Sequence, residues 1–266
     1  MEALNELGPA LEELIHELGT LTTSGASYGS TDIVLTNYIF WLLVSSVILV
    51  VLMFVSVKKL RLVPANRLSN GVEALADMVR TSVVGEMLGP DGVRRHFPLI
   101  ATIFFFILIN NFVGLIPGCK PGTGTMGVTV ALAVVSFVAF NAAGIKSQGL
   151  GHYLLSFSPK GLPPGINVLV WVIEAFSSVL RIFTLAVRLF ANMYAGHIIL
   201  GVFAILTSLF VEQAIATASV ATALPSVAWM ALLIALYMLE VLVAVVQAYV
   251  FTVLTTVYIS LAEHAH

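Results

Sequence analysis

The chain has 266 residues, of which 59% are hydrophobic and 10% charged, and its formal net charge at pH 7 is −2. Its mean hydropathy of +1.02 excludes a soluble domain and indicates an integral membrane protein. The sequence holds one cysteine, Cys119, so no intrachain disulfide can form.

The segment 1–36 is predicted to lie on the outer or periplasmic side of the membrane and to begin with a short amphipathic helix. Its leucines recur at helical spacing opposite a set of glutamates, which is typical of a surface helix. The segment lacks the basic start and apolar core of a cleavable signal peptide. We therefore expect the first apolar span to act as the membrane signal.

The first membrane span is predicted at 37–57, an apolar run that is long enough to cross a hydrocarbon core of roughly 30 Å. Residues 1–57 contain no Lys or Arg, whereas Lys58, Lys59 and Arg61 follow at once. Because cytoplasmic segments carry the excess of basic residues, this pattern places the C-terminal end of the span in the cytoplasm.

The next segment, 68–88, is predicted to be an amphipathic helix on the cytoplasmic surface. It sets an apolar stripe opposite Glu73, Asp77 and Arg80, so it is too polar to insert and suited to lie along the membrane. The Gly-Pro-Asp-Gly sequence that starts at Gly89 is expected to end this helix.

Two further spans are predicted at 97–117 and 126–146. The first follows the basic residues Arg94 and Arg95 and therefore runs outward, and the second returns to the cytoplasm at Lys146. The loop that follows is rich in Gly, Pro and Ser and is assigned to the cytoplasmic side.

The last two apolar runs, 166–210 and 225–262, are too long for ordinary spans. At 1.5 Å per residue they make helices of about 67 and 57 Å, roughly twice the hydrocarbon thickness. Either the first run turns back near Gly196 and Gly201, or its helix is steeply tilted and buried against protein. Two such helices joined by a polar loop favour a tilted hairpin.

Charged side chains interrupt the first long run at a helical interval. Glu174, Arg181 and Arg188 are seven residues apart and share one helical face, which Asn192 continues one turn later. His197 lies nine residues after Arg188, on roughly the opposite side. An arginine cannot lose its proton, so Arg188 must keep its charge and find a partner. Because an arginine at the centre of a membrane helix is costly, such a residue normally marks an ion path or a counter-ion site.

The second long run carries its own polar row, which includes Tyr237, Glu240 and Gln247 at spacings of three and seven residues. One interpretation is that the two rows only bond each other and hold the helices together. The other is that they line an ion path, and the cost of Arg188, Glu174 and Glu240 in an apolar body favours this second interpretation.

The sequence Arg-Leu-Phe-Ala-Asn-Met-Tyr-Ala-Gly that starts at Arg188 resembles the signature of subunit a of F-type ATP synthases, the stator half of a rotary proton channel. The resemblance extends to Glu174, to Gln247 with the tail after it, and to Asn111 with the Gly-Leu-Ile-Pro sequence that follows. It covers most of the chain from about Trp41 onward.

Three positions depart from the pattern of that family. Ala191 stands where the family often has glycine, which still keeps this helix face small. His197 and Glu240 carry the imidazole and the acid the other way round from other members. Either arrangement supplies one carboxylate and one histidine, so the sequence leaves open which of the two relays the proton.

The resemblance implies a fold and a role for each candidate residue. In that family the two overlong helices form a nearly horizontal hairpin around a ring of small c subunits, each with a carboxylate inside the membrane. Arg188 would face this carboxylate, stabilise its ionised form and keep two aqueous half-channels apart. Glu174 belongs to the cytoplasmic half-channel, and Arg181 and Asn111 are secondary candidates. The residues assigned to the outer half-channel and its junction with Arg188 are Asn192, His197, Glu240 and Gln247.

The resemblance therefore implies an all-α membrane protein that carries out no bond chemistry itself and uses no cofactor or metal. Its expected partners are the c ring, the b subunits of the peripheral stalk and the rest of the ATP synthase in a lipid bilayer, with no nucleic acid. We expect it in the inner membrane of a bacterium or, alternatively, of an organelle. The preference for protons over sodium follows from the family and not from these residues.

A self-contained secondary transporter, with Arg188 binding an anionic substrate, is the alternative function. The sequence shows neither the paired broken helices nor the repeated halves that such transporters usually have. It also contains no His-Glu-x-x-His, no Gly-x-Ser-x-Gly and no phosphate-binding Gly-rich loop, so it supports neither an intramembrane hydrolase nor a nucleotide site.

Overall fold

The computed structural model describes residues 37–58, 67–116, 118–151, 153, 164–217 and 220–263. Within these ranges all regular structure is helical, and five helical segments are long and apolar enough to cross a membrane. The predicted class, an all-α membrane protein, is confirmed for the described chain. The predicted surface helix within 1–36 lies outside the described residues.

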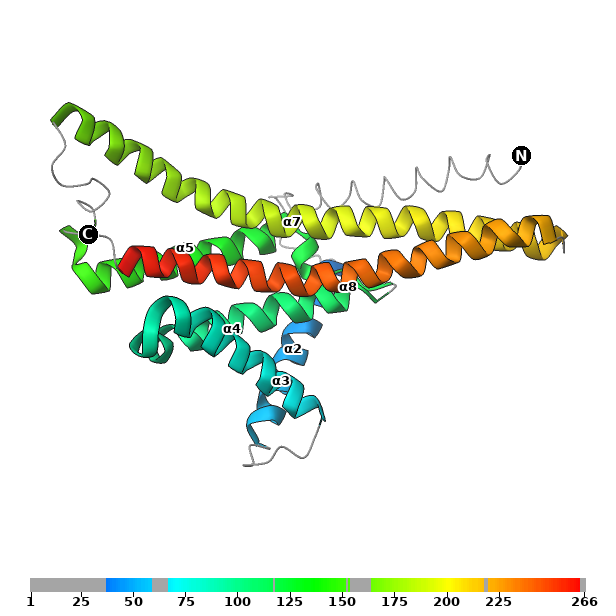
Figure 1. Cartoon of the computed structure of the whole chain (residues 1–266), viewed down its shortest axis with the longest axis horizontal. Coiled ribbons are helices and arrows are strands. Elements are labelled where there is room, and N and C mark those ends of the chain that lie inside the picture. The colour runs from blue at the N-terminus through cyan, green and yellow to red at the C-terminus, as the bar shows by residue number, and fades with distance from the viewer. Residues whose placement is uncertain are drawn as a thin grey trace, which may run out of the picture.

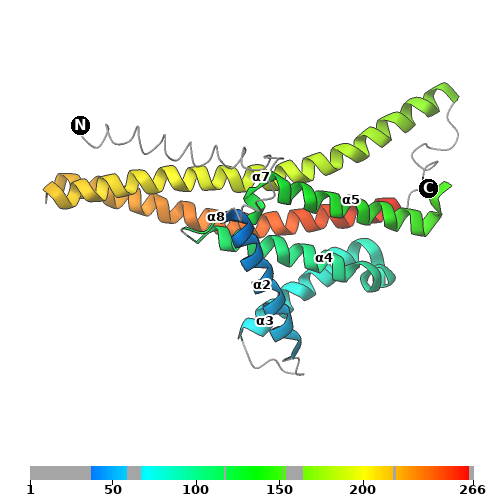
Figure 2. The same cartoon turned by 180° about the vertical axis from the view of Figure 1, so that it is seen from behind.

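Helix α2 (Asn37–Lys58) covers the first predicted span. Most of its apolar side chains are exposed, and Val50 and Phe54 are among them. The hydroxyls of Ser45 and Ser46 donate to carbonyls one turn earlier, each at 2.8 Å, so their polar groups are satisfied within the helix. Figure 2 shows α2 crossing the bundle beside α4 instead of running along the long helices.

The amphipathic segment and the second span form two helical pieces that are broken at Gly89 and pack against each other. Helix α3 (Arg67–Met78) continues through a π-helical stretch (Val79–Gly85) into α4 (Glu86–Gly114). The sequence predicted separate helices at 68–88 and 97–117, with a break at Gly89. Gly89 does leave helical geometry, with φ of 67° and ψ of −177°, a conformation that favours glycine. A new helix begins directly after Gly89. Pro90 is tolerated there because the backbone nitrogens in the first turn of a helix do not donate hydrogen bonds within the helix.

The turn after α4 folds back into the protein. Gly122–Gly124 form a short 3₁₀ turn that is fully buried, together with Pro121. A Cβ added to Gly114 would lie 2.6 Å from Cβ of Pro121, so the turn can pack this closely only against glycine. Buried non-helical backbone of this kind occurs in membrane proteins where other protein segments surround it.

Helix α5 (Met126–Gln148) covers the third predicted span and ends at Gly149, which has a φ of 81°. It packs against both α7 (Pro164–Thr217) and α8 (Val220–Glu263). The positive φ of Gly149 turns the chain out of the helix, and its N–H still bonds to the Ile145 carbonyl at 2.8 Å.

The two long helices are longer than their predicted ranges of 166–210 and 225–262. With 54 and 44 residues, α7 and α8 are about 81 and 66 Å long at 1.5 Å per residue. Helix α7 runs through Gly196 and Gly201 without turning back. The predicted polar loop is largely helical because 211–217 contains neither glycine nor proline. Figure 1 shows α7 and α8 antiparallel and side by side over one half of their length, with the first part of α7 diverging.

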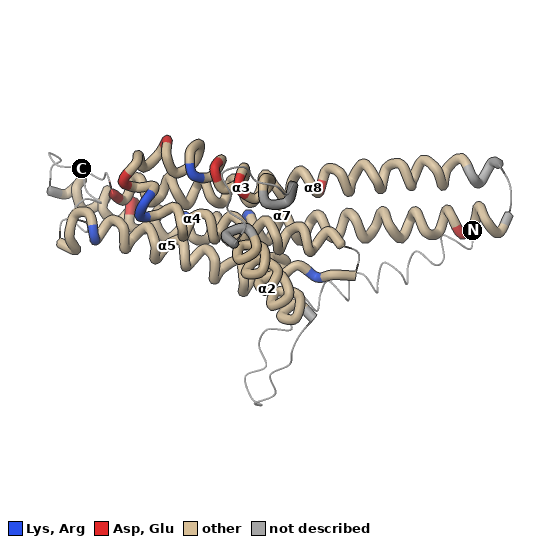
Figure 3. Tube along the Cα trace, turned by 90° about the horizontal axis from the view of Figure 1, so that it is seen from below, with Lys and Arg blue, Asp and Glu red and all other residues tan. Residues whose placement is uncertain are grey.

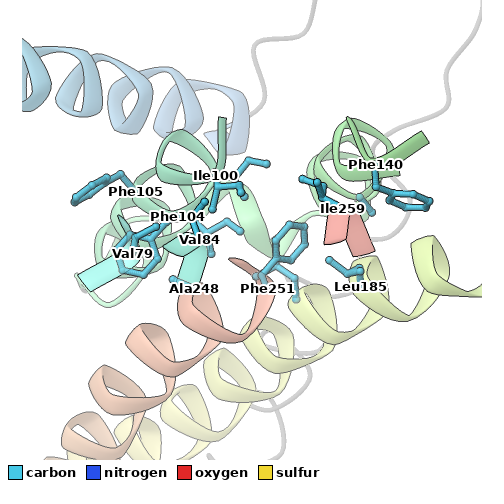
Figure 4. Packing of buried hydrophobic residues seen from close by; sticks show 14 of the residues in the cluster. Val79, Val84, Ile100, Phe104, Phe105, Phe140, Leu185, Ala248, Phe251 and Ile259 are labelled. Atoms are coloured by element: carbon cyan, nitrogen blue, oxygen red, sulfur yellow. The ribbon is translucent and has the colours of Figure 1, made fainter. Parts of the chain in front are cut away.

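The hydrophobic core joins one half of the long helix pair to α4 and α5. Figure 4 shows Phe104 of α4, Phe140 of α5, Leu185 of α7 and Phe251 of α8 converging in this core. The other half of α8, from Leu224 to Glu240, is mostly exposed. The long pair is thus anchored at one end and presents large apolar surfaces elsewhere.

Candidate functional site

Arg188 lies on an exposed face of α7 in the middle of the helix. Its neighbours Leu185 and Leu189 are buried in the core, so the helix turns Arg188 away from the bundle. Among the described residues, no carboxylate, hydrogen-bond acceptor or aromatic ring contacts the guanidinium. A fixed ion pair between Arg188 and Glu174 or Glu240 is therefore not formed in this structure.

The exposed face around Arg188 is made of small side chains. Thr184, Ala191 and Ala195 lie one or two turns from Arg188 on the same side of α7, and all three are exposed. Because these side chains are short, another helix can approach the backbone of α7 closely at the level of the arginine.

The charged pair of α7 is formed by Glu174 and Arg181 instead. Nη2 of Arg181 donates to Oε1 of Glu174 at 2.7 Å, and the guanidinium carbon lies 5.4 Å from the ring centroid of Tyr258 on α8. Glu174 is 14 residues from Arg188, which is about 21 Å along the helix axis. The row that the sequence predicted on one helical face therefore contains two separate electrostatic sites.

Glu240 of α8 packs against Gly196 of α7. A Cβ added to Gly196 would overlap the Glu240 carboxylate, so glycine makes the room that this carboxylate occupies. His197 follows Gly196 in the chain and is half-buried. The structure thus brings the predicted acid and imidazole to the same part of the helix pair, although no described hydrogen bond joins them.

Two predicted amides are buried with unused donors. Gln247 is 8% exposed, and neither its Nε2 nor the Nδ2 of Asn192 finds an acceptor among the described residues. Buried amide donors are nearly always paired with protein or with internal water. The two side chains therefore mark a polar interior next to Arg188 that is suited to hydration.

Asn111 joins three elements behind this site. Its Nδ2 donates to the Ala244 carbonyl of α8 at 3.3 Å, and its Oδ1 accepts from the Thr123 hydroxyl in the buried turn at 2.9 Å. Ala244 lies one turn before Gln247, so Asn111 fixes the part of α8 that carries the unpaired amide. Oδ1 of the neighbouring Asn110 is buried and lacks a donor among the described residues.

The roles of several residues that contact this site could not be read from the sequence. Gly196 ends the signature that starts at Arg188, but nothing in the sequence shows that it makes room for Glu240, and Thr123 lies in what reads as an ordinary loop. Tyr258 is spaced 11 residues from Gln247, which continues the α8 row and could have indicated that it faces the same helix. The other two contacts depend on helix packing, which one sequence does not encode locally.

Most of the charged residues that Figure 3 marks lie along one end of the bundle. There Oε1 of Glu263, the last residue of α8, lies 3.0 Å from Nε2 of His96 and 3.4 Å from Nη1 of Arg95. Within the described ranges, no three His, Cys, Asp or Glu side chains form a group that could hold a metal ion. The arrangement supports charge stabilisation and proton transfer through polar groups.

Comparison with known proteins gives one family. The family model described as ATP synthase A chain matches residues 39–260. A protein of Zymomonas mobilis named ATP synthase subunit a is 36% identical over 279 aligned residues that cover all of both chains. A protein of the same name from Rhodopseudomonas palustris is 38% identical, over 89% of this chain and 92% of that protein. A third, from Chloroherpeton thalassium, is 35% identical over 88% of this chain and 68% of its own length.

Proposed function

Because the chain belongs to the family of subunit a of the F-type ATP synthases, a non-catalytic part of the membrane sector, we propose that it carries protons through two aqueous half-channels separated by Arg188. Proton flow through these half-channels would drive a ring of c subunits and be coupled to ATP synthesis. The observation that carries the proposal is the exposed guanidinium of Arg188 in the middle of an apolar helix, which has no partner in the part of the chain that the structure describes.

The surroundings of Arg188 favour a charge partner on another subunit. An arginine inside a membrane needs a counter-charge, but Glu174 is bonded to Arg181 and Glu240 packs against Gly196, away from Arg188. The small side chains beside Arg188 leave room for a partner helix. A carboxylate on that helix would be held ionised near Arg188, and a neutral one would gain little from the charge.

The two polar regions on either side of Arg188 support two separate half-channels. Glu174 and Arg181 lie near Tyr258, five residues before Glu263 at the charged end of α8, which the distribution of basic residues assigns to the cytoplasm. Asn192 and Glu240, which packs against Gly196, lie on the other side of Arg188, farther along α7. The fixed positive charge between them would repel a proton that moved directly from one to the other.

The helix lengths favour the arrangement proposed for α7 and α8, a hairpin that lies nearly along the membrane. Neither helix can stand upright in a hydrocarbon core of roughly 30 Å at its observed length. We place the c ring against the Arg188 face and the b subunits of the peripheral stalk elsewhere on the exposed apolar surface. The complex would reside in the inner membrane of a bacterium.

The test replaces Arg188 in the complete ATP synthase. In inside-out membrane vesicles, Arg188→Ala should abolish ATP-driven proton pumping while ATP hydrolysis by the catalytic sector persists. Arg94→Ala is the matched control, because Arg94 is an exposed arginine of the same chain with no described partner. Pumping by the Arg188→Ala complex at the level of the Arg94→Ala complex would overturn the proposal.

A further inference from the structure

Tyr258 of α8 contacts both the hydrophobic core and the charged pair on α7. Its ring centroid lies 5.9 Å from that of Phe140 on α5, and the two ring planes make an angle of 63°. Aromatic pairs favour such edge-to-face arrangements, and Phe140 is itself only 3% exposed. The packing against α5 therefore orients the Tyr258 ring. The guanidinium carbon of Arg181 lies over that ring, 5.4 Å from its centroid.

The contacts of Tyr258 are made by its ring and not by its hydroxyl group. The hydroxyl forms no hydrogen bond with any other residue that the structure describes. A cation within about 6 Å of the centroid of an aromatic ring is attracted by the negative charge on the ring face. The face of the Tyr258 ring is thus a binding surface for Arg181, and a phenylalanine ring could replace it.

The ion pair between Arg181 and Glu174 needs this additional contact. The two residues are seven positions apart, about 10 Å along the helix axis, so both side chains must stay extended toward each other. The side chains are 24% and 40% exposed, and such ion pairs contribute little because holding two long side chains in one geometry costs conformational entropy. A ring that already restricts Arg181 reduces the entropy that the ion pair must lose.

We propose that Tyr258 is a positioning residue of the cytoplasmic half-channel, where its ring holds Arg181 in contact with Glu174 through a cation–π interaction. The inference rests on the proposed function, because it assumes that Glu174 exchanges protons with the cytoplasm. While Arg181 is held by the ring, the Glu174 carboxylate keeps one place in this path. Without the ring, both charged side chains would sample several positions, and proton exchange would be slower.

The experiment measures ATP-driven pumping by the complete ATP synthase in inside-out vesicles, at equal amounts of assembled complex. Tyr258→Phe keeps the ring and should pump at the normal rate. Tyr258→Leu removes the ring and should lower the rate by about two- to fivefold, the factor expected when a cation–π contact at a partly exposed site is lost. The loss should not exceed that of Arg181→Gln, because Tyr258 acts only through this arginine.

Fluorinated phenylalanines at position 258 separate the charge contact from packing. One, two or three fluorine atoms weaken the negative face of the ring stepwise and change its shape little. Pumping should therefore fall with each added fluorine, whereas a ring that only packs α8 against α5 would give equal rates. The same series at Phe137 of α5 is the matched control and should give equal rates, because no cation of the described residues lies over that ring.

The same substitutions in an Arg181→Gln complex complete the test. There the fluorine series should give equal rates, and Tyr258→Leu should cause no further loss, since the side chain that the ring holds is absent. Equal pumping across the fluorine series in the complex that keeps Arg181 overturns the proposal. A loss in Tyr258→Leu that is as large in the Arg181→Gln complex also overturns it, because that loss comes from packing alone.

Arg188→Ala in the same vesicles separates the outcome for Tyr258 from the outcome for the proposed function. If Arg188→Ala abolishes pumping while the fluorine series gives equal rates, the half-channel proposal stands and the positioning role of Tyr258 fails. If Arg188→Ala keeps full pumping, the proposed function fails, and the positioning role fails with it because the half-channel that it assumes is absent.

Discussion

Arg181 and Arg188 are two arginines on one face of one helix, seven residues apart, and the fold treats them in opposite ways. Arg181 is paired with a carboxylate at 2.7 Å and lies over an aromatic ring. Arg188 is exposed and has no partner among the described residues. Sequence spacing alone makes the two equivalent, and the difference comes from Glu174 on α7 and Tyr258 on α8, which both contact Arg181.

The chain pairs Arg181 with one of its own carboxylates and leaves Arg188 exposed without a carboxylate partner among the described residues. A paired arginine contributes to a local structure, and its removal leaves one carboxylate without its counter-charge. An unpaired arginine in an apolar helix has no structural benefit to offset its cost. Such an unpaired charge is typical of a functional site, where a protein keeps a residue that lowers its stability because the residue is needed for activity.

The largest predicted effect is the difference between Arg188→Gln and Arg181→Gln. Neutralising Arg188 should reduce ATP-driven pumping below detection, because the proposed ring carboxylate would then lose its counter-charge. Neutralising Arg181 should leave measurable pumping, reduced severalfold, because Glu174 can still exchange protons with the cytoplasm. Pumping rates of the two complexes in the same vesicles check this, and equal losses would show that the two arginines act as one unit.

The next effect concerns the contact between Gly196 and Glu240. In Gly196→Ala the new Cβ would overlap the carboxylate and push Glu240 out of its place between α7 and α8. Pumping should fall at least about tenfold, since displacing a proton-transfer group by an ångström is costly. Gly127→Ala is the matched control because nothing lies within 4 Å of a Cβ at that position. A normal rate in Gly196→Ala would show that the position of Glu240 is not critical.

The sequence predicts the fold well where one physical quantity decides it. Apolar run length gives the spans, and the lengths of α7 and α8 already exclude upright helices. The end of α7 was predicted too early because the polar residues Glu212 and Gln213 read as loop, although no glycine or proline interrupts the helix there. Helix propensity and packing against α8 outweigh that polarity.

The candidate site is predicted less completely than the fold. The free-energy cost of a charge in an apolar medium identifies Arg188, Glu174 and Glu240 as candidates from the sequence, because the charge of a residue does not depend on its neighbours in the fold. The contacts of these charges are predicted less well. Glu174 pairs with Arg181 within α7, where the spacing of seven permits the bond but does not show that it forms, and the space that Gly196 makes for Glu240 arises only when α7 packs against α8.

A smaller effect is expected for Asn111, whose amide nitrogen and amide oxygen are both hydrogen-bonded. Asn111→Leu removes the bonds to Thr123 and to the Ala244 carbonyl, which should cost about 1–2 kcal/mol for interhelical polar contacts in a membrane protein. The thermal midpoint of the detergent-purified chain should fall by about 3–6 °C. Thr102→Val, which removes an exposed hydroxyl bond on the same helix, should change it by less than the scatter between preparations. Equal midpoints for both variants would show that Asn111 does not tie α4 to α8.

The smallest change in stability, and the one that best separates function from structure, is expected for Gln247. Its Nε2 is buried without an acceptor among the described residues, so an apolar side chain of similar size removes a group that costs free energy. Gln247→Leu should therefore leave the thermal midpoint unchanged or raise it by a few degrees, where Asn111→Leu lowers it. Pumping should nevertheless fall severalfold, because the leucine interrupts the polar interior beside Arg188. A lower midpoint together with normal pumping would mean that Gln247 only packs, and that the polar interior beside Arg188 is not part of the proton path.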